Sequence, residues 1–460
     1  MFSFDKISFM KHLAFALVGC LAFAESEAQT QQPIFKDKAD SIEYNGMFQK
    51  ISKVYGVMGT TNEKQRDSLA AVAKYWIERQ ERLREKVVGY RWVYSPSHPQ
   101  LNEALEQNRD SVTAITLTKL AELPPELFQF KNLTKLELID CRISKLPRRL
   151  SRLKKLEHVA VFTDRSGKRI KLATNKTVKT LVIGSNRLPR HYRAFKALYR
   201  LDLSRNNLTD FPNIKGCKKL KELSLRENLL TLENLNARST ILEVLELQKN
   251  KIRQVPSAIA QLPNLKRLVF NYNPIESVSD KMSMLQRLEQ VGFYSNQLSQ
   301  VPEALYSLTS LKEIDLYYNQ IERLDARASQ WKKLEVLYLS NNKLISLPDN
   351  LGELTNLREL YVHNNRLSAL PEGLGQLTNL KILRVNSNYL PLLPSIEKLE
   401  KLENIDLSNN QLHTFSLDVF KFPKLKIISL LGNQWDEDTK QEIKKQAVAL
   451  ENKEVTVLFN

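Results

Sequence analysis

Tyrosine residues recur at a fixed interval in the middle of the chain, and their setting favours binding over catalysis. The spacing from Tyr294 to Tyr317 is the same as the spacing from Tyr338 to Tyr361. Tyrosine is enriched at the dominant positions of protein interfaces because it joins a large apolar ring to a polar hydroxyl. The alternative is that tyrosine simply suits β-strands and that neighbouring side chains cover its ring. We predict a docking surface for a protein or peptide, formed by Tyr272, Tyr294, Asp315, Tyr317, Tyr318, Tyr338, Tyr361, His363 and Arg384.

A strongly basic segment lies between residues 142 and 200. It holds 18 Lys and Arg residues against Glu157 and Asp164, a local net charge of +16 in a chain of net charge +18. Such a surface favours an anionic partner, such as lipopolysaccharide, anionic lipid or acidic glycan. Nucleic acid is unlikely because no nucleic-acid-binding motif is present, and the alternative is a merely solubilising surface. The predicted anion-binding residues are Arg148, Arg149, Arg152, Lys154, Lys155, Lys168, Arg169, Lys171, Arg187, Arg190 and Arg193.

The sequence carries no recognisable catalytic motif. Its six histidines, at positions 12, 98, 158, 191, 363 and 413, lack metal-ligand spacing. There is no Gly-rich phosphate loop and no G-x-S-x-G motif. We therefore expect no enzymatic activity, no cofactor and no metal. An activity in the N-terminal region, which no motif marks, is the weakest alternative.

The elements that position the tyrosines come from an internal repeat. The stretch around Leu357 follows L-x-x-L-x-L-x-x-N-x-L-x-x-L-P, and its Asn place recurs at a nearly constant interval. The x-L-x-L part alternates with period two, which predicts a strand with one buried face. One unit cannot bury its leucines alone, so the units must stack. The Asn places are Asn186, Asn206, Asn228, Asn250, Asn273, Asn296, Asn319, Asn342, Asn365, Asn388, Asn410 and Asn433.

This pattern resembles the 22–23-residue class of the leucine-rich repeat family. The resemblance implies an α/β solenoid, curved like a horseshoe, with a parallel β-sheet on its concave face. About 14 repeats would span residues 111–433, with an irregular part near 156–177 where residues 159–173 could form a hairpin around Ser166–Gly167. Each ladder Asn is expected to bond backbone groups of its own repeat and of the next one. Members of the family bind ligands as interaction scaffolds, and the binding residues lie in the variable positions of the repeat.

The repeat also predicts how the tyrosines are arranged. Residues that flank the buried strand positions should project from the concave face. Tyr338 and Tyr361 then share one column on adjacent strands, and Tyr294 and Tyr317 share the next. The charged residues expected at the rim of this surface are Arg267, Glu313, Glu359 and Arg384.

Both ends of the solenoid require caps that shield the core from water. Residues 29–110 are expected to form a helical N-terminal cap, with a capping box at Thr60 and Glu63, an apolar stripe from Leu69 to Val87 and a stop at Gly89. A separate partner-binding helix is the alternative for this region. Residues 434–460 are expected to form a C-terminal cap made of a helix and an edge strand.

The N-terminal segment 1–28 has the pattern of a secretory signal peptide. Lys6 and Lys11 precede an apolar stretch at 13–24 that is too short to span a bilayer. Cleavage after Ala28 or Ala24 is expected, and lipid attachment at Cys20 is the less favoured alternative. The protein is thus expected to be exported to the periplasm, the cell surface or the medium, with no transmembrane segment in the mature chain.

The cysteines favour a bacterial origin for such an exported protein. Cys141 takes an Asn place and Cys217 takes a core place, so both are expected to be buried thiols. Animal extracellular members of the family usually carry disulfide-bonded caps, which three cysteines at these positions do not provide.

Overall fold

The computed structural model describes residues 29–35, 87–94, 96–143, 145–162, 170–173, 175–184, 195–451 and 455–459. The chain divides into two compact units. One comprises Met1–Gln107 and Ala114–Lys119, and the other comprises Asn108–Thr113 and Leu120–Asn460. The expected signal peptide, the capping box at Thr60 and Glu63, and most of the apolar stripe lie outside the described residues.

The described part of the first unit contains strands where a helix was predicted. β1 (Gln29–Phe35) pairs antiparallel with β2 (Val87–Tyr94). The only helix described here is the short α4 (Leu101–Leu105), and β3 (Ala114–Thr118) follows it. The prediction of a helical cap was therefore wrong for residues 29–35 and 87–94. Gly89 lies inside β2, whose sequence VVGYRWVY is rich in the β-branched and aromatic residues that favour strands.

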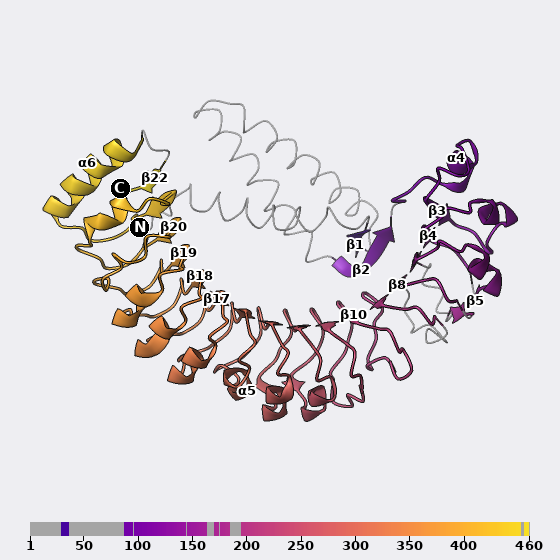
Figure 1. Cartoon of the computed structure of the whole chain (residues 1–460), viewed down its shortest axis with the longest axis horizontal. Helices are drawn as coiled ribbons and strands as arrows, with labels where there is room; N and C mark the ends of the chain where they lie inside the picture. The colour runs from indigo at the N-terminus through magenta and orange to yellow at the C-terminus, as the bar shows by residue number, and fades with distance from the viewer. Residues whose placement is uncertain are drawn as a thin grey trace. The chain divides into compact units, whose positions relative to one another are not determined.

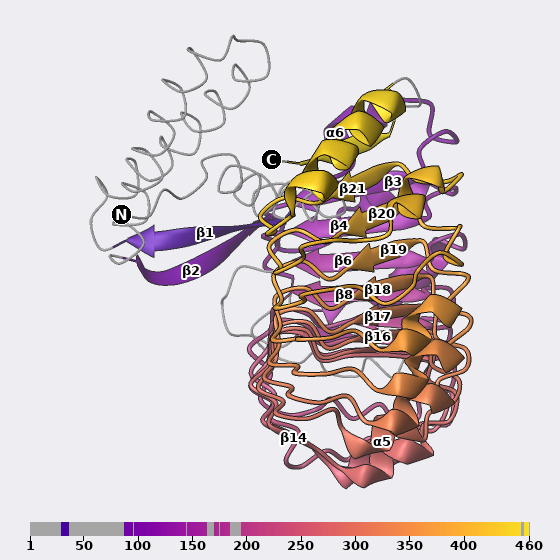
Figure 2. The same cartoon turned by 90° about the vertical axis from the view of Figure 1, so that its left-hand side faces the viewer.

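The second unit is a solenoid whose main strands form one parallel sheet along the inner side of a curve (Figure 1). Each strand pairs in register with the corresponding strand of the next repeat, so the strands lie one above another (Figure 2). These strands are β4 (Lys135–Ile139), β6 (His158–Phe162), β8 (Thr180–Gly184), β9 (Arg200–Asp202), β10 (Glu222–Ser224), β11 (Val244–Glu246), β13 (Arg267–Val269), β15 (Gln290–Gly292), β16 (Glu313–Asp315), β17 (Val336–Tyr338), β18 (Glu359–Tyr361), β19 (Ile382–Arg384), β20 (Asn404–Asp406), β21 (Ile427–Ser429) and β22 (Thr456–Leu458).

The return segments of the repeats carry short helices on the outer side of the curve (Figure 1). Many begin directly after a proline, whose fixed φ suits the start of a helical turn. The 3-10 helices are η1 (Pro125–Gln129), η2 (Arg148–Arg152), η4 (Ser257–Gln261), η5 (Asp280–Met284), η6 (Ala326–Gln330), η7 (Asp349–Glu353), η8 (Glu372–Gln376) and η9 (Leu417–Lys421), and α5 (Glu303–Tyr306) takes the same place. Two small parallel pairs accompany them: β5 (Lys145–Leu146) with β7 (Lys171–Leu172), and β12 (Gln254–Val255) with β14 (Ser277–Val278).

The repeat leucines form the core between the strands and the return segments. Leu337, Leu360 and Leu383 are aligned on adjacent strands and are 0% exposed. Burying one such side chain contributes about 1.5–3 kcal/mol. The same contribution recurs in every repeat, which confirms the predicted solenoid with its parallel sheet.

The ladder asparagines join each repeat to the one before it. Asn365 Nδ2 donates to Leu339 O at 3.0 Å in the preceding repeat and to Val362 O at 2.9 Å in its own. Its Oδ1 accepts the Leu344 N–H, also from the preceding repeat, at 3.0 Å. The same pattern recurs at Asn388. The expectation of bonds to the next repeat was wrong, because the side-chain amide faces the turn of the preceding repeat. Asn186 lies outside the described residues.

The irregular repeat near residues 156–177 still contributes a strand to the sheet. β6 pairs with β4 and β8, whereas β7 pairs with β5 in a separate small sheet. The described flanks of Ser166–Gly167 thus belong to different sheets. The predicted hairpin over 159–173 is not formed by them, and its tip at Ser166–Gly167 lies outside the described residues.

Two smaller expectations concern the C-terminal end and the cysteines. α6 (Glu437–Glu451) precedes β22, which pairs with β21 at the edge of the sheet, as predicted. Cys141 is buried, but Cys217 is only half-buried, contrary to the prediction. The reason is local, since Cys217 lies between two turns, at residues 215–216 and 218–219, in place of the 3-10 helix found in most return segments.

Candidate ligand-binding surface

The register of the parallel sheet arranges the outward side chains in columns. In β16 the outward Asp315 follows Ile314, which is 0% exposed. In-register pairing aligns Asp315 with Tyr338 on β17, Tyr361 on β18 and Arg384 on β19. Neighbouring parallel strands lie about 4.8 Å apart, so consecutive side chains of a column are in contact range. The columns predicted from the repeat are therefore present.

One group of rings lies just beyond the ends of β13 to β18. The Tyr272 and Tyr294 ring centroids are 4.9 Å apart, and the Tyr294 and Tyr317 rings stack at 5.4 Å with an interplanar angle of 3°. The Tyr318 ring meets the Tyr317 ring edge-on at 4.7 Å. The Tyr317 hydroxyl oxygen lies 3.2 Å from His363 Nε2. These contacts join the five predicted residues into one aromatic surface.

A second ring pair lies within the strands themselves. The Tyr338 and Tyr361 rings stack with centroids 4.8 Å apart and an interplanar angle of 20°. The Tyr361 hydroxyl donates a hydrogen bond to Glu359 Oε2 at 2.8 Å. The Arg384 guanidinium carbon lies 5.9 Å from the Tyr361 ring centroid. Tyr361 therefore contacts a carboxylate through its hydroxyl and a guanidinium group through its ring.

The rings differ in how far solvent reaches them. Tyr272 is 49% exposed and Tyr318 is 48% exposed. Tyr294, Tyr317, Tyr338 and Tyr361 are half-buried. Neighbouring rings thus cover part of four tyrosines and leave two projecting toward solvent. Accessible aromatic side chains grouped in this way are typical of interaction surfaces.

Burial dominates the electrostatics of this surface. It raises the pKa of Asp315 from 3.8 to about 6, with a smaller contribution from the nearby carboxylate of Glu313, while the bond that Asp315 accepts from the Tyr317 backbone N–H acts in the opposite direction. Burial likewise raises the pKa of Tyr317 and of Tyr338 to about 12. These two phenols are neutral at physiological pH and remain hydrogen-bond donors.

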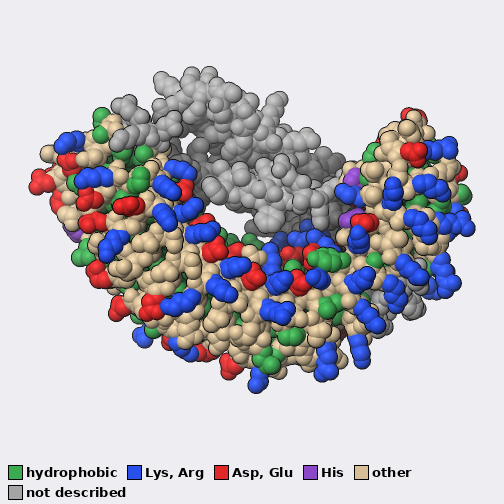
Figure 3. All heavy atoms as spheres, in the orientation of Figure 1, with side chains coloured by type: hydrophobic (Ala, Val, Ile, Leu, Met, Phe, Trp, Pro, Cys, Tyr) green, Lys and Arg blue, Asp and Glu red, His purple; other side chains and the backbone are tan. Residues whose placement is uncertain are grey.

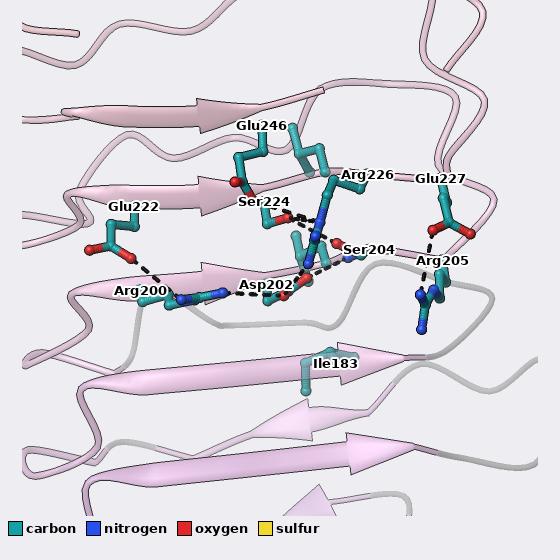
Figure 4. A network of polar contacts seen from close by, with 12 residues as sticks. Ile183, Arg200, Asp202, Ser204, Arg205, Glu222, Ser224, Arg226, Glu227 and Glu246 are labelled. Carbon is teal, nitrogen blue, oxygen red and sulfur yellow. Dashed lines mark hydrogen bonds and ion pairs between the residues drawn. The ribbon is translucent and has the colours of Figure 1, made fainter. Parts of the chain in front are cut away.

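A charged network occupies the same columns nearer the N-terminus, and the sequence analysis missed it (Figure 4). Asp202, whose side chain is 4% exposed, lies 3.9 Å from a guanidinium nitrogen of both Arg200 and Arg226. Arg226 Nε lies 3.6 Å from Glu246 Oε2, and Arg200 Nη1 lies 3.7 Å from Glu222 Oε2. Here the chain itself pairs the carboxylates and guanidinium groups of the concave face.

The missed network did have a sequence signal. Its strand residues occupy the same outward positions of β9, β10 and β11 that hold tyrosines and acids in β16 to β18. Arg226 lies two residues beyond the end of β10. Reading the outward columns over the whole repeat region, instead of from residue 267 onward, would have found the alternation of Arg with Asp and Glu.

The described basic residues lie on exposed parts of η2 and its neighbours. Arg148, Arg149, Arg152, Lys154, Lys155 and Lys171 are all exposed. Figure 3 shows Lys and Arg side chains gathered over the N-terminal repeats with few acids among them. The nearby acid Glu157 pairs with Lys179 at 2.6 Å. Lys168, Arg169, Arg187, Arg190 and Arg193 lie outside the described residues.

The described part of the chain lacks two further kinds of feature, a metal-binding group and a membrane-spanning helix. Among the described residues, no group of three or more His, Cys, Asp or Glu side chains is placed to hold a metal ion. No described helix combines the length and the apolar character needed to cross a membrane.

Comparison with known proteins agrees with this architecture. The Leucine rich repeat family profile matches residues 309–367 and 355–412. A human protein, leucine-rich repeats and immunoglobulin-like domains protein 3, is 33% identical over 115 residues, which is 24% of this chain and 9% of the human protein. The chain thus spans about a tenth of that relative's length.

Solved structures resemble a larger part of the chain. An LRR protein of Leptospira interrogans is 25% identical, with a TM-score of 0.61 over 79% of this chain and 100% of its own. The Toll–Spatzle complex of Drosophila matches 70% of this chain and 50% of its own, with 16% identity and a TM-score of 0.53. The repeat pattern, the asparagine ladder and these matches together identify a leucine-rich repeat protein.

Proposed function

We propose that the concave face between β13 and β19 binds a protein or peptide ligand and that the protein acts as a non-catalytic interaction scaffold. The observation that carries this proposal is the aromatic surface itself. Seven tyrosine and histidine side chains line the ends of consecutive strands, and Tyr272 and Tyr318 remain about half exposed. A solvent-facing sheet has no structural need for this many rings, and such rings supply much of the binding energy at protein interfaces.

The rigid backbone of the solenoid supports the same proposal. The strands are held by in-register pairing and by the asparagine ladder, so their side chains are displayed at fixed spacing. A preorganised surface loses little conformational entropy when a partner binds. Leucine-rich repeat proteins generally serve as protein-interaction scaffolds, which agrees with this role.

The test is affinity capture of partners with the full chain and with a Tyr317→Ala, Tyr338→Ala, Tyr361→Ala variant. Tyr389→Ala is the matched control, because Tyr389 is 55% exposed on the same solenoid but lies outside the outward columns of the sheet. We expect partners to be lost with the triple variant and retained with the control. Retention of every partner by a folded triple variant would refute the proposal.

The exposed basic residues of η2 favour a second candidate function, attachment to an anionic surface. None of the ion pairs formed among the described residues involves Arg148, Arg152 or Lys154, so these charges are available to a ligand. The test is sedimentation with vesicles of anionic phosphatidylglycerol at low and high salt, compared with vesicles of zwitterionic phosphatidylcholine. Binding that survives high salt, or that is unchanged when these three residues are replaced by Gln, would contradict an electrostatic attachment.

We also propose that the protein is exported, through the signal-peptide pattern of residues 1–28. The support is the order of Lys6, Lys11 and the apolar stretch 13–24. Mass spectrometry of the N-terminus after expression should show cleavage after Ala24 or Ala28. An intact Met1 would refute this assignment, and a lipid-modified Cys20 would favour the anchored alternative.

A further inference from the structure

Within the aromatic surface, tyrosine rings and carboxylates converge around the middle of β17. We call this group the acid–tyrosine cluster; it comprises Glu313, Asp315, Tyr338, Glu359 and Tyr361. Glu313 aligns with Val336 and then with Glu359 across three adjacent strands, while Asp315 aligns with Tyr338 and then with Tyr361. Asp315 therefore precedes the stacked rings in their own column, and Glu313 and Glu359 lie in the neighbouring column.

The spacing of the strands leaves room in this cluster for a small cationic group. Two strand steps of about 4.8 Å separate the Glu313 and Glu359 positions. The shorter Val336 side chain lies between these two positions. The carboxylates of Glu359, Glu313 and Asp315 are all close enough to Tyr338 to add to the rise in its pKa that burial causes. Three carboxylates thus lie near the Tyr338 side chain.

These acids have no cationic partner within the described part of the chain. None of the ion pairs found there includes Glu313, Asp315 or Glu359, which instead take part in hydrogen bonds with neutral groups. Two nearby cations pair with other acids: Lys312 pairs with Glu289 at 2.7 Å and Arg358 pairs with Glu335 at 3.1 Å. The Arg384 guanidinium lies 5.9 Å from the Tyr361 ring centroid and contacts the ring instead of forming an ion pair with these three acids.

The charged network of β9 to β11 differs from this cluster, because its acids do have cationic partners. In that network each of Asp202, Glu222 and Glu246 has an arginine of the same face within 4.0 Å. The same columns, a few repeats further on, carry acids that the described arginines do not pair with. Partly desolvating a carboxylate without a countercharge is costly, as the raised pKa of Asp315 shows. A ligand that brings the missing cation would remove this cost.

We propose that the acid–tyrosine cluster receives an arginine side chain of a protein partner. A guanidinium group is planar, so it can stack on a tyrosine face while its N–H groups bond carboxylates in pairs. Arg384, whose guanidinium lies over the outer side of the ring pair, shows that the Tyr361 ring accepts such a group. This inference rests on the proposed concave-face function and specifies the chemistry of the partner.

The test uses a labelled oligo-arginine peptide, with oligo-citrulline as its neutral isostere and oligo-lysine as a compact cation. An acid-neutral variant of the full chain carries Glu313→Gln, Asp315→Asn and Glu359→Gln, which keep the side-chain shapes and a hydrogen-bond acceptor. A matched control carries Glu322→Gln, Asp349→Asn and Glu372→Gln. These three control acids are exposed in the return segments of neighbouring repeats. Their replacement changes the net charge by the same amount as the acid-neutral variant does.

We expect the wild-type chain to bind oligo-arginine more tightly than oligo-lysine, and oligo-citrulline weakest. In the acid-neutral variant the affinity for oligo-arginine should fall by about tenfold or more, whereas the control should change by less than about twofold. Circular dichroism of each variant verifies folding. Equal affinity of the wild type and the acid-neutral variant, or an equal loss in the control, would overturn the inference, as would absence of oligo-arginine binding to the wild type.

The two proposals fail in distinguishable ways. If the binding of oligo-arginine does not depend on the three acids but the capture of partners depends on the tyrosines, the concave face binds a ligand whose contacting group is not a cation. If the binding of oligo-arginine depends on the three acids but the tyrosine variant keeps every natural partner, the cation-binding site exists and the aromatic docking proposal is wrong.

Discussion

Replacing Asp315 by Asn should make the protein more stable at neutral pH, although it removes a charge from the proposed binding surface. The Asp315 carboxyl is half-buried in β16, beside Glu313 and tyrosine rings, and no described cation pairs with it. Its Oδ1 accepts a hydrogen bond from the Tyr317 backbone N–H at 3.1 Å. Asn has nearly the same shape and retains that acceptor, so the substitution removes the charge and little else.

The magnitude follows from the raised pKa. The pKa of Asp315 changes from 3.8 to about 6 on folding. Each tenfold change in an ionisation constant corresponds to about 1.4 kcal/mol, which gives an upper value of about 3 kcal/mol. Solvent reaching a half-buried group reduces it, so we expect a gain of about 1–3 kcal/mol for Asp315→Asn at neutral pH.

The sign of the pH dependence is fixed by proton linkage. Because the folded state holds this proton more tightly than the unfolded chain, the stability linked to it is fully present below about pH 4. It is lost as the pH rises toward about 6. The advantage of the Asn variant should therefore be large at about pH 7.5 and small at about pH 4.

Equilibrium urea unfolding at these two pH values, followed by circular dichroism, measures the difference. Asp406→Asn is the matched control, because Asp406 occupies the same column in β20 and accepts bonds from the Ser408 N–H at 3.1 Å and hydroxyl at 2.6 Å. The control should not gain stability at neutral pH. An Asp315→Asn variant that is no more stable than wild type at about pH 7.5, or that gains equally at both pH values, would refute the reasoning.

Three further predictions concern the ladder, the sheet and one tyrosine. Asn365→Ala removes three hydrogen bonds and leaves the Leu344 N–H without its acceptor, although Leu339 O and Val362 O keep the bonds donated by Asn342 and Asn388. It should lower the free energy of unfolding by about 2–4 kcal/mol in urea titration. Asn379→Ala, whose bonds are at the exposed surface, should cost about 1 kcal/mol or less; equal losses would contradict the ladder's role. Gly292→Ala places a Cβ 2.6 Å from Asn271 Oδ1 and should cost about 1–3 kcal/mol, read as a lower melting temperature; an unchanged value would show that Asn271 moves freely. Since the pKa of Tyr338 is raised to about 12 by burial, the tyrosinate absorbance at about pH 10.5 should differ little between wild type and Tyr338→Phe; a loss of more than half a tyrosinate in the variant would mean that this ring is solvated.

The N-terminal region shows where sequence reasoning failed. An apolar stripe and a capping box favoured helix throughout residues 29–110, yet 29–35 and 87–94 pair as strands. Their pairing joins two segments that are far apart in sequence, which no local periodicity reveals. The run VVGYRWVY carries a strand signal in its β-branched and aromatic residues, and this signal outweighs the single Gly89 as a helix stop.

Over the regular repeats, the sequence by itself determined the fold and the strand positions of the outward tyrosines. The period-two alternation fixes which face each residue takes, and the repeat length places Tyr338 beside Tyr361 and Tyr294 beside Tyr317. These are local rules applied many times, so they require no knowledge of distant contacts.

Only the tertiary structure decided how those side chains are paired, covered and charged. The side chains of neighbouring strands decide whether Asp315 meets a cation and how deeply the Tyr317 ring is covered. They also decide which repeat an Asn amide bonds. The physical reason is that burial and Coulomb energies are properties of several residues at once, whereas a repeat position is a property of one.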